Sequence, residues 1–559
     1  MQKVLGIDLG TTYSCAAYID HSEKPVVVKN REGELTTPSV VFFETAESVV
    51  VGNSAKESSR LYPDEVVSFV KRSIGQQGAC WNLHGTLRTP SEISSYILKK
   101  VVGDAVETLR SETLLGPEET ITDVVITCPA YFGVNEREAT RQAGEIAGLH
   151  VVGIINEPTA AAIAYGVANA HENKVVLVYD LGGGTFDITM IAINAGAIQV
   201  ICTGGDHSLG GKLWDDRIIQ YLAEEFARQT GNTEDILADP ETLQELALSA
   251  ERAKKMLSAR DKAPVAINYK GNRARVELTR TVFDEMTRDL LERTVMLTQE
   301  MLEEAKKKGY SLDKVEEILL VGGSTRMPQV TERIGQEFAI PSRSFDPDEA
   351  VAKGAALYAS RQAAFDRLLE TAARETGKSR EKLGKELSMG LTSVEKLALE
   401  AGISPDELGG AVNMDIVNVT SRSFGTIAIQ TEGEREEVLC NLILRNTPLP
   451  AREKRQFFTV APNQQSVTIR VLESLSSQEL AQPLEGTEIG ETVLELPPGL
   501  AAGSPLEIEF TLNEGGLLEL EAQEITGGRQ VSARFETVDA ITAEELDEAK
   551  KRLEETQVV

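Results

Sequence analysis

Two glycine-rich segments of the same design carry the residues best suited to hold a phosphate. The first is Asp8-Leu9-Gly10-Thr11-Thr12, and the second is Asp180-Leu181-Gly182-Gly183-Gly184-Thr185. Glycine lets backbone N–H groups close on an anion, threonine hydroxyls add donors, and a neighbouring carboxylate can hold a divalent cation. A single turn of this kind is more often an ordinary tight turn, but the duplication favours a nucleotide clamped between two hairpins.

Apolar, β-branched runs flank each glycine segment and predict the strands that position it. Residues 3–7 and 13–19 enclose the first segment, and residues 175–179 and 186–193 enclose the second. Each segment is therefore predicted to be the turn of a β-hairpin. Strands, glycine turns and helices alternate over residues 1–364, which predicts an α/β domain of two related lobes.

The pattern changes twice beyond this domain. Helices are expected over residues 91–110, 135–148, 213–229, 240–258, 281–308 and 348–364. Residues 365–413 lose the strand pattern and predict a small helical insert and linker, with capping boxes at Thr392 with Glu395 and at Ser404 with Glu407. Residues 414–537 predict an antiparallel β domain, and residues 538–559 hold one last helix, from Thr542 to about Thr556.

Other polar residues stand where helices and strands begin or end. Gly322-Gly323-Ser324-Thr325-Arg326 follows an apolar strand, so its amides can approach a purine or ribose while Arg326 stacks on the base. Gly210-Gly211 precedes a helix whose N-terminus can contact a phosphate. Both segments can equally be plain turns. Glu157 can orient a water, and Lys71 can neutralise charge on a transferred phosphoryl group.

Composition limits the classes of partner. At 559 residues the chain is too long for one core, and its formal charge of −30 argues against a nucleic-acid or anionic-membrane surface. Residues 397–404 have the spacing of a helix-turn-helix, but Asp406 and Glu407 would repel DNA phosphates. Five scattered cysteines, no leader and no membrane-spanning stretch predict a cytoplasmic protein.

The chain resembles the seventy-kilodalton heat-shock chaperones, DnaK-like proteins built on the actin and sugar-kinase ATPase fold. The resemblance is dense over residues 1–359 and rests on segments 6–12, 129–132, 155–162, 179–187, 320–328 and 347–351. It is looser over residues 414–537, where Arg445-Asn446-Thr447 and residues 463–472 look like the peptide-binding β sandwich. It implies an α/β actin-like ATPase domain with a duplicated ribonuclease-H-like core, then the helical insert and an all-β sandwich.

The resemblance also implies roles for individual residues with ATP or ADP, Mg²⁺ and K⁺. The implied catalytic residues are Lys71, Glu157, Asp180 and Thr185, and Asp8, Asp180 and Asp187 would surround the metal ions. Nucleotide contacts are implied for Gly10, Thr11, Thr12, Tyr13, Gly182, Gly183, Gly184, Thr185, Gly210, Gly211, Glu251, Lys254, Lys255, Ser258, Gly322, Gly323, Ser324, Arg326 and Asp348. Pro129 and Arg137 match the switch that relays the nucleotide state to the second domain.

In the β domain, the resemblance implies a cleft for unfolded or extended polypeptide, lined by Ile427, Phe457, Val460 and Val467. It also implies a nucleotide-exchange factor as a partner. The family's arginine and aspartate that contact a J-domain protein are replaced by Gly153 and Asn418, so an ordinary J-domain partner is not expected. The family's helical-bundle lid is truncated to the one helix after Thr542.

These features together predict an ATP-dependent molecular chaperone that hydrolyses ATP and binds extended apolar peptides. Two other functions fit parts of the chain. A small-molecule kinase on the same ATPase fold is disfavoured because residues 414–535 form a β domain with no phosphoryl-acceptor role. A nucleotide-switched adaptor for one dedicated partner is the stronger alternative, because the linker is altered and the helical insert is unusual.

Overall fold

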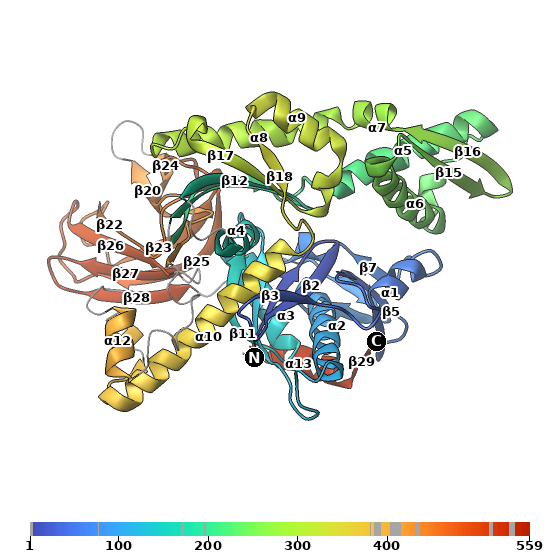
Figure 1. Ribbon diagram of the computed structural model, residues 1–559. Helices are drawn as coiled ribbons and strands as arrows, with labels where there is room; N and C mark the ends of the chain where they lie inside the picture. Colours follow the sequence, from blue (N-terminus) through green and yellow to red (C-terminus); the bar gives the residue numbers. More distant parts are fainter. Residues whose placement is uncertain are drawn as a thin grey trace.

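The computed structural model describes residues 4–76, 78–168, 173–194, 197–380, 382–384, 393–402, 415–430, 436–513, 518–535 and 543–559. Two α/β lobes face each other, and a β sandwich lies against both of them (Figure 1). Among the helices described, none is long and apolar enough to cross a membrane.

The first lobe is built on a mixed sheet and a smaller sheet beside it. The main strands are β1 (Val4–Leu9), β2 (Tyr13–Ile19), β3 (Pro25–Val28), β4 (Thr37–Pro38), β10 (Asp123–Cys128) and β11 (His150–Asn156), in the order β11-β10-β1-β2-β3 with β4 also paired to β2. The smaller sheet includes β5 (Val40–Phe43), β6 (Ser48–Val51) and β7 (Val66–Ser68). The remaining elements are α1 (Asn53–Ser58), the 3-10 turn η1 (Val70–Ser73), the hairpin β8 (Trp81–Leu83) and β9 (Thr86–Arg88), α2 (Pro90–Ser111) and α3 (Val134–Ile146).

The second lobe repeats this design. Its sheet strands are β12 (Lys174–Leu181), β13 (Phe186–Asn194), β14 (Ala197–Asp206), β17 (Val315–Val321), β18 (Ser342–Ser344) and β19 (Asp415–Val417), in the order β18-β17-β12-β13-β14-β19. Its outer part is the hairpin β15 (Lys262–Tyr269) and β16 (Asn272–Thr279). Its helices are α5 (Gly211–Thr230), α6 (Pro240–Ala259), α7 (Arg280–Met286), α8 (Arg288–Lys307) and α9 (Pro328–Phe338). α10 (Ala350–Thr376) packs on the first-lobe strands β1, β2 and β10, and α4 (Glu157–Ala168) packs against α10 and against strands of both lobes.

The two predicted glycine hairpins are confirmed and stand at equivalent places in the two lobes. β1 pairs antiparallel with β2 and parallel with β10, and β12 pairs antiparallel with β13 and parallel with β17. In the second hairpin Asp180 lies directly opposite Asp187. Residues opposite each other in an antiparallel pair point to the same face, so the register brings both carboxylates to one side of the sheet.

Two predicted helices differ from the structure. The helix expected over residues 281–308 is divided at Thr287, whose buried hydroxyl donates to the carbonyl of Phe283 at 2.8 Å. The helix expected to end at residue 364 continues as α10 to Thr376, where Gly377 has a φ of 68°. The predicted start of the insert therefore falls inside α10, because apolar residues keep the helical spacing past that point.

The insert packs against the extended end of α10. Leu368 of α10, Leu383 and Leu397 form part of one buried cluster. Leu397 belongs to α12 (Val394–Glu400), whose N-cap is Ser393, accepting from the N–H of Lys396 at 3.2 Å, and not the predicted Thr392. The second predicted capping box, Ser404 with Glu407, lies outside the described residues.

The predicted β domain is a sandwich of two antiparallel sheets. One sheet contains β20 (Ser423–Gln430), β21 (Glu436–Ile443), β23 (Ser466–Ser474), β24 (Leu480–Ala481) and β25 (Gly486–Glu495), in the order β24-β21-β20-β23-β25. The other contains β22 (Ala451–Phe458), β26 (Pro505–Leu512), β27 (Leu518–Glu524) and β28 (Gln530–Phe535), in that order. Alternate residues of both sheets, including Ile469, Val471, Ile508 and Phe510, form the core between them.

The last helix is α13 (Ala543–Glu555), and it is followed by β29 (Gln557–Val558). The sequence predicted this helix as the remnant of a lid. In the structure it packs against the first lobe, beneath α3 and α2, and Figure 1 shows it away from the sandwich. β29 pairs in parallel with β6.

Candidate nucleotide-binding site

A cavity of about 550 Å³ lies between the two lobes, and both glycine hairpins open into it. Its wall brings together predicted residues from segments far apart in the sequence. The predicted residues that line it are Asp8, Gly10, Thr11, Thr12, Tyr13, Glu157, Asp180, Gly182, Gly183, Thr185, Glu251, Lys254, Lys255, Ser258, Gly322, Gly323, Ser324, Arg326 and Asp348. The volume suits a ligand of nucleotide size.

Close packing explains the glycines of the two turns. A Cβ on Gly183 would lie 1.8 Å from the Thr12 hydroxyl, and a Cβ on Gly184 would lie 2.5 Å from a Thr11 side-chain carbon. The two hairpins therefore approach each other across the lobes at a distance that only glycine allows. Gly322, with a φ of 81°, would place a Cβ 2.5 Å from Asp180 Oδ1. Side chains at these positions would push the turns apart.

A buried group of charges lies at the deep end of the cavity. The Nζ atom of Lys71, on η1, is hydrogen-bonded to Oε1 of Glu157, at the start of α4. Asp8 accepts from the hydroxyl of Thr127 at 3.0 Å, and Asp187 accepts from the N–H of Ala130 at 3.1 Å. Lys71 and Asp187 do not line the cavity itself, but these contacts hold them directly behind its wall.

The electrostatics of this group fit a bound cation. Burial, reinforced by the charge of Glu157, raises the pKa of Asp8 to about 7 and the pKa values of Asp180 and Asp187 well above the usual range. Burial disfavours the charged form of Lys71, but Glu157 and Asp8 outweigh it and raise the pKa of Lys71. One lysine cannot neutralise four carboxylates, and Asp187 Oδ2 is buried without a hydrogen-bond partner. A divalent cation would relieve both deficits.

The carboxylates suit Mg²⁺, because this ion needs only one or two direct protein ligands and no complete cage of protein ligands. Within the described residues, no group of three or more His, Cys, Asp and Glu side chains is close enough to form a ready metal site. Mg²⁺ commonly keeps several waters and binds through one or two carboxylates and the phosphates of its substrate. Asp8, Asp180 and Asp187 are the candidate carboxylates for that kind of coordination.

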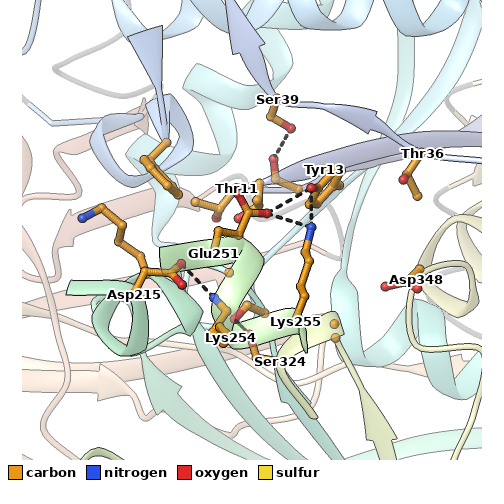
Figure 2. A pocket seen from close by; sticks show the side chains of 18 of the residues that line it. Thr11, Tyr13, Thr36, Ser39, Asp215, Glu251, Lys254, Lys255, Ser324 and Asp348 are labelled. Carbon is orange, nitrogen blue, oxygen red and sulfur yellow. Dashed lines mark hydrogen bonds and ion pairs between the residues drawn. The ribbon is translucent and has the colours of Figure 1, made fainter. Parts of the chain in front are cut away.

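A charged clamp joins the two lobes at the outer part of the cavity (Figure 2). Glu251 of α6 accepts from the Tyr13 hydroxyl at 3.1 Å, and it pairs with Lys56 at 2.5 Å and with Lys255 at 2.8 Å. Burial would raise the pKa of Glu251, but Lys56 and Lys255 overcome it and lower the pKa to about 2. Tyr13 and Lys56 belong to the first lobe and Glu251 and Lys255 to the second, so this clamp closes the cleft.

Arg326 and Asp348 form an ion pair at the second-lobe wall of the cavity. Ser324 donates to the carbonyl of Gly182 at 2.9 Å, which ties this wall to the second phosphate turn. Arg326 was predicted to stack on a base. Its planar guanidinium, held in place by Asp348, is suited to that contact.

The helix-start glycines support the turns without lining the cavity. The N–H of Gly211 donates to the carbonyl of Gly182 at 3.0 Å, and a Cβ on Gly210 would lie 2.4 Å from the carbonyl carbon of Gly184. Sequence reasoning missed Lys56 and Asp215, which also line the cavity. Asp215 pairs with Lys254 at 2.8 Å (Figure 2). No glycine motif marks Lys56, whereas Asp215, one turn into α5 after Gly211, could have been noticed.

The segment from Pro129 to Val134 joins the charged group to the sandwich. Its Ala130 N–H reaches Asp187, and its Phe132 carbonyl accepts from Arg137 Nε at 3.2 Å and from the Ser421 hydroxyl at 3.0 Å. The N–H of Val134 donates to Glu473 of β23 at 3.2 Å. Six consecutive residues, including the predicted switch residue Pro129, thus connect a candidate metal ligand to the β domain.

The linker is itself part of the second lobe. β19 extends the sheet by pairing in parallel with β14, and the Asn418 side chain accepts from the Thr159 hydroxyl at 2.9 Å. The turn around Asn446 docks nearby, where its side chain accepts from the N–H of Thr203 at 3.0 Å. Gly153 lies on β11, where a Cβ would be 3.3 Å from the ring of Tyr358.

The four predicted peptide-cleft residues do not share one face of the sandwich. Phe457 and Val467 are half-buried against the sandwich core, and Val460 is exposed. Ile427 points the other way, because its neighbour Thr426 pairs with the core residue Val471 while Ile427 pairs with Leu439. The structure therefore does not bring Ile427 together with the other three residues, because the register of the hairpin formed by β20 and β21 turns its side chain to the opposite face of the sheet.

Fold and site together define a two-lobed α/β protein with an interlobe cleft lined by two glycine turns and with an attached β sandwich. A family model described as Hsp70 protein matches residues 4–364 and 377–558. The chain belongs to the Hsp70 family. Proteins of this family are ATP-binding chaperones with ATPase activity, which agrees with the predicted class of function.

Proposed function

We propose that this protein is an ATP-dependent chaperone that binds extended apolar polypeptide segments under the control of ATP binding and hydrolysis. The observation that carries the proposal is the continuous contact from Asp187, through residues 130–134, to Glu473 of the sandwich. A chaperone of this kind needs its nucleotide site and its peptide site to be coupled, and this segment contacts a candidate metal ligand at one end and the β sandwich at the other.

In the proposed hydrolysis, the chain holds the triphosphate between the two glycine turns and orients a water. Thr11, Thr12 and Thr185 donate hydrogen bonds to phosphate oxygens. Glu157, fixed by Lys71, positions the water, and Lys71 neutralises charge on the transferred group. Mg²⁺, when bound beside Asp8, Asp180 and Asp187, would neutralise phosphate charge, and K⁺ is proposed to share these carboxylates.

The proposed peptide site lies between the two sheets near Phe457 and Val467. Val467 faces the interior, opposite the buried Leu494 of β25. An extended segment would form main-chain hydrogen bonds at the strand edges and place one apolar side chain beside these residues. Partners of this site are unfolded or extended polypeptides, and an exchange factor would act on the cleft between the lobes.

The test is steady-state ATP hydrolysis with and without a panel of extended hydrophobic peptides. Val467→Phe fills the interior position and should abolish stimulation. The matched control is Val493→Phe, because Val493 lies on the next strand but is 48% exposed on the outer face. Stimulation that survives Val467→Phe would overturn the proposed peptide site.

An adaptor that serves one dedicated partner is the second candidate. It is favoured by Gly153 and Asn418, which carry no charge at the two positions of the family's J-domain contact, and by the packed insert of α10 and α12. It predicts a basal hydrolysis rate that no peptide in the panel changes. The same experiment therefore separates the two functions.

A further inference from the structure

The C-terminal residues 543–559 form a segment, here called the clasp, that is built into the first lobe. Ala549 and Leu553 of α13 are each only 2% exposed and belong to the same buried cluster as the lobe's own core. Lys99 of α2 donates to the carbonyl of Leu553 at 2.8 Å, so the lobe binds the backbone of the last turn of α13 directly. The clasp is thus packed as part of the lobe.

A buried carboxylate of the lobe depends on the clasp for one of its counter-ions. Arg552 binds Glu92 with two hydrogen bonds, Nε to Oε1 at 3.1 Å and Nη2 to Oε2 at 3.2 Å. Glu92 is 1% exposed and also pairs with the buried Arg88. Removing one partner from a buried ion pair destabilises the folded state. Release of Arg552 from Glu92 would therefore destabilise the first lobe, which favours the bound clasp.

The last residues extend a sheet of the lobe. The N–H of Gln557 donates to the backbone carbonyl of Glu47 at 2.9 Å. The N–H of Val559 donates to the carbonyl of Val49 at 3.0 Å, and the carbonyl of Val559 accepts from the N–H of Val51 at 2.9 Å. These bonds cover the open edge of β6, which would otherwise expose unpaired backbone groups. Figure 1 shows that the segment crosses the first lobe from the sandwich side to the far side, where the C-terminus lies beside β5 and α1.

The clasp limits how far the sandwich can move. Eight residue steps separate Phe535 at the end of β28 from Ala543 at the start of α13, which spans at most about 29 Å. At its other end the sandwich follows β19, which is paired to the second lobe. The sandwich is therefore tied to both lobes, one tie at each end.

We propose that the clasp remains bound to the first lobe in every nucleotide state and keeps the sandwich next to the ATPase domain after ATP hydrolysis. The clasp then acts as a tether and never closes over the sandwich as a lid. This inference rests on the proposed function only in its consequence, which is that α13 does not cover a peptide bound to the sandwich.

Hydrogen–deuterium exchange of the wild-type protein tests the proposal directly. Amides of residues 543–559 should keep the same protection with ATP and with ADP. An exchange rate about tenfold faster with ADP would overturn the proposal, because it would mean that the segment is released. Protection of residues 182–185 by either nucleotide reports binding in the same experiment, so a protein that binds no nucleotide is recognised separately.

Small-angle scattering of clasp variants tests the tether. Leu553→Asp should detach α13, and the radius of gyration should then be larger with ADP than with ATP. Lys551→Met changes the net charge equally on the exposed face of α13 and should behave as wild type, with no difference between nucleotides. If Leu553→Asp fails to fold, Gln557→Pro removes the donor to Glu47 and serves instead. A wild-type protein that expands with ADP as much as the variant contradicts the proposal.

Discussion

The carboxylate of Glu473 in the sandwich accepts a hydrogen bond from the backbone N–H of Val134, the first residue of α3, at 3.2 Å. Glu473 is 5% exposed, and a Cβ on the preceding Gly133 would lie 2.3 Å from its Oε1 atom. A helix N-terminus favours a negative charge, so this contact offsets part of the cost of burying the Glu473 carboxylate between the two domains. Val134 lies four residues after Ala130, whose backbone N–H donates to Asp187.

Docking of the sandwich should depend on pH through Glu473. Burial, partly offset by Arg422, raises the pKa of Glu473 from 4.5 to about 6 in the docked form. Since the docked form binds the proton more tightly, docking is favoured at low pH. Protonation of Glu473 contributes to the free energy of docking in full below about pH 4.5. This contribution is lost as the pH rises through about 6, and it amounts to at most about 2 kcal/mol.

Energy transfer between dyes measures this effect. Cys80 is the exposed cysteine of the five, and Glu491→Cys adds a second label on the sandwich. The docked fraction of the labelled protein should fall between pH 5 and pH 7, and Glu473→Gln should flatten the profile. The control is Glu453→Gln, which removes the charge of an exposed carboxylate on β22 of the same sandwich. An unchanged profile in Glu473→Gln would show that another group titrates.

Gly133→Ala should separate the domains while leaving nucleotide binding intact. The added methyl group would collide with the Glu473 carboxylate, and residue 133 does not line the nucleotide cavity. The labelled pair should report undocking with ATP, while the nucleotide Kd stays within about twofold of wild type. Gly335→Ala, in α9, introduces a methyl group with no neighbour within 4 Å at a position without a left-handed backbone, and it controls for the effect of an added methyl group.

Glu251→Gln should speed the release of bound nucleotide by roughly tenfold or more. The change removes the charge that holds Lys56, Lys255 and the Tyr13 hydroxyl together across the cleft, and hydrogen bonds to charged groups contribute about 1.5–3 kcal/mol each. Stopped-flow release of a fluorescent ADP measures the rate. Glu245→Gln, exposed on the same helix, should leave it unchanged. Equal rates in the two variants would show that the clamp does not retain nucleotide.

Lys71→Met should lower kcat for ATP hydrolysis by about 10²- to 10³-fold, since a fixed positive charge beside the transferred group is lost. Nucleotide affinity should change little, because Lys71 lies behind the cavity wall. Lys306→Met on the exposed face of α8 is the matched control. A loss confined to affinity would place Lys71 in binding and not in hydrolysis.

Local patterns predicted the parts of the fold that lie close together in the sequence. The hairpins around Gly10 and Gly183 pair strands that are adjacent in the sequence. The glycines in their turns stand where the backbone is too crowded for a side chain, so both features could be predicted from local sequence. The segments that line the cavity were matched through family resemblance, and the structure then brought nearly all of them together. Lys56 was missed because an isolated lysine on a short helix carries no pattern, although it completes the clamp with Glu251.

Long-range pairing set the limit of sequence reasoning. Nothing in the residues of β29 indicates β6 as a partner about 500 positions earlier, and Glu473 gives no local sign that it meets Val134. The face of the sheet on which Ile427 lies could not be predicted either, because a shift of one residue in the strand register reverses which side chains point inward. α13 was predicted at the right residues, but its burial against Glu92 depends on a surface formed by other elements.

The most direct test of coupling between cleft and sandwich is the release of a fluorescent apolar peptide after mixing with ATP or ADP. The wild-type protein should release the peptide faster with ATP than with ADP, and Gly133→Ala should abolish the difference. Equal release rates with both nucleotides in the wild-type protein would contradict the account, since the contacts from Asp187 to Glu473 would then carry no signal.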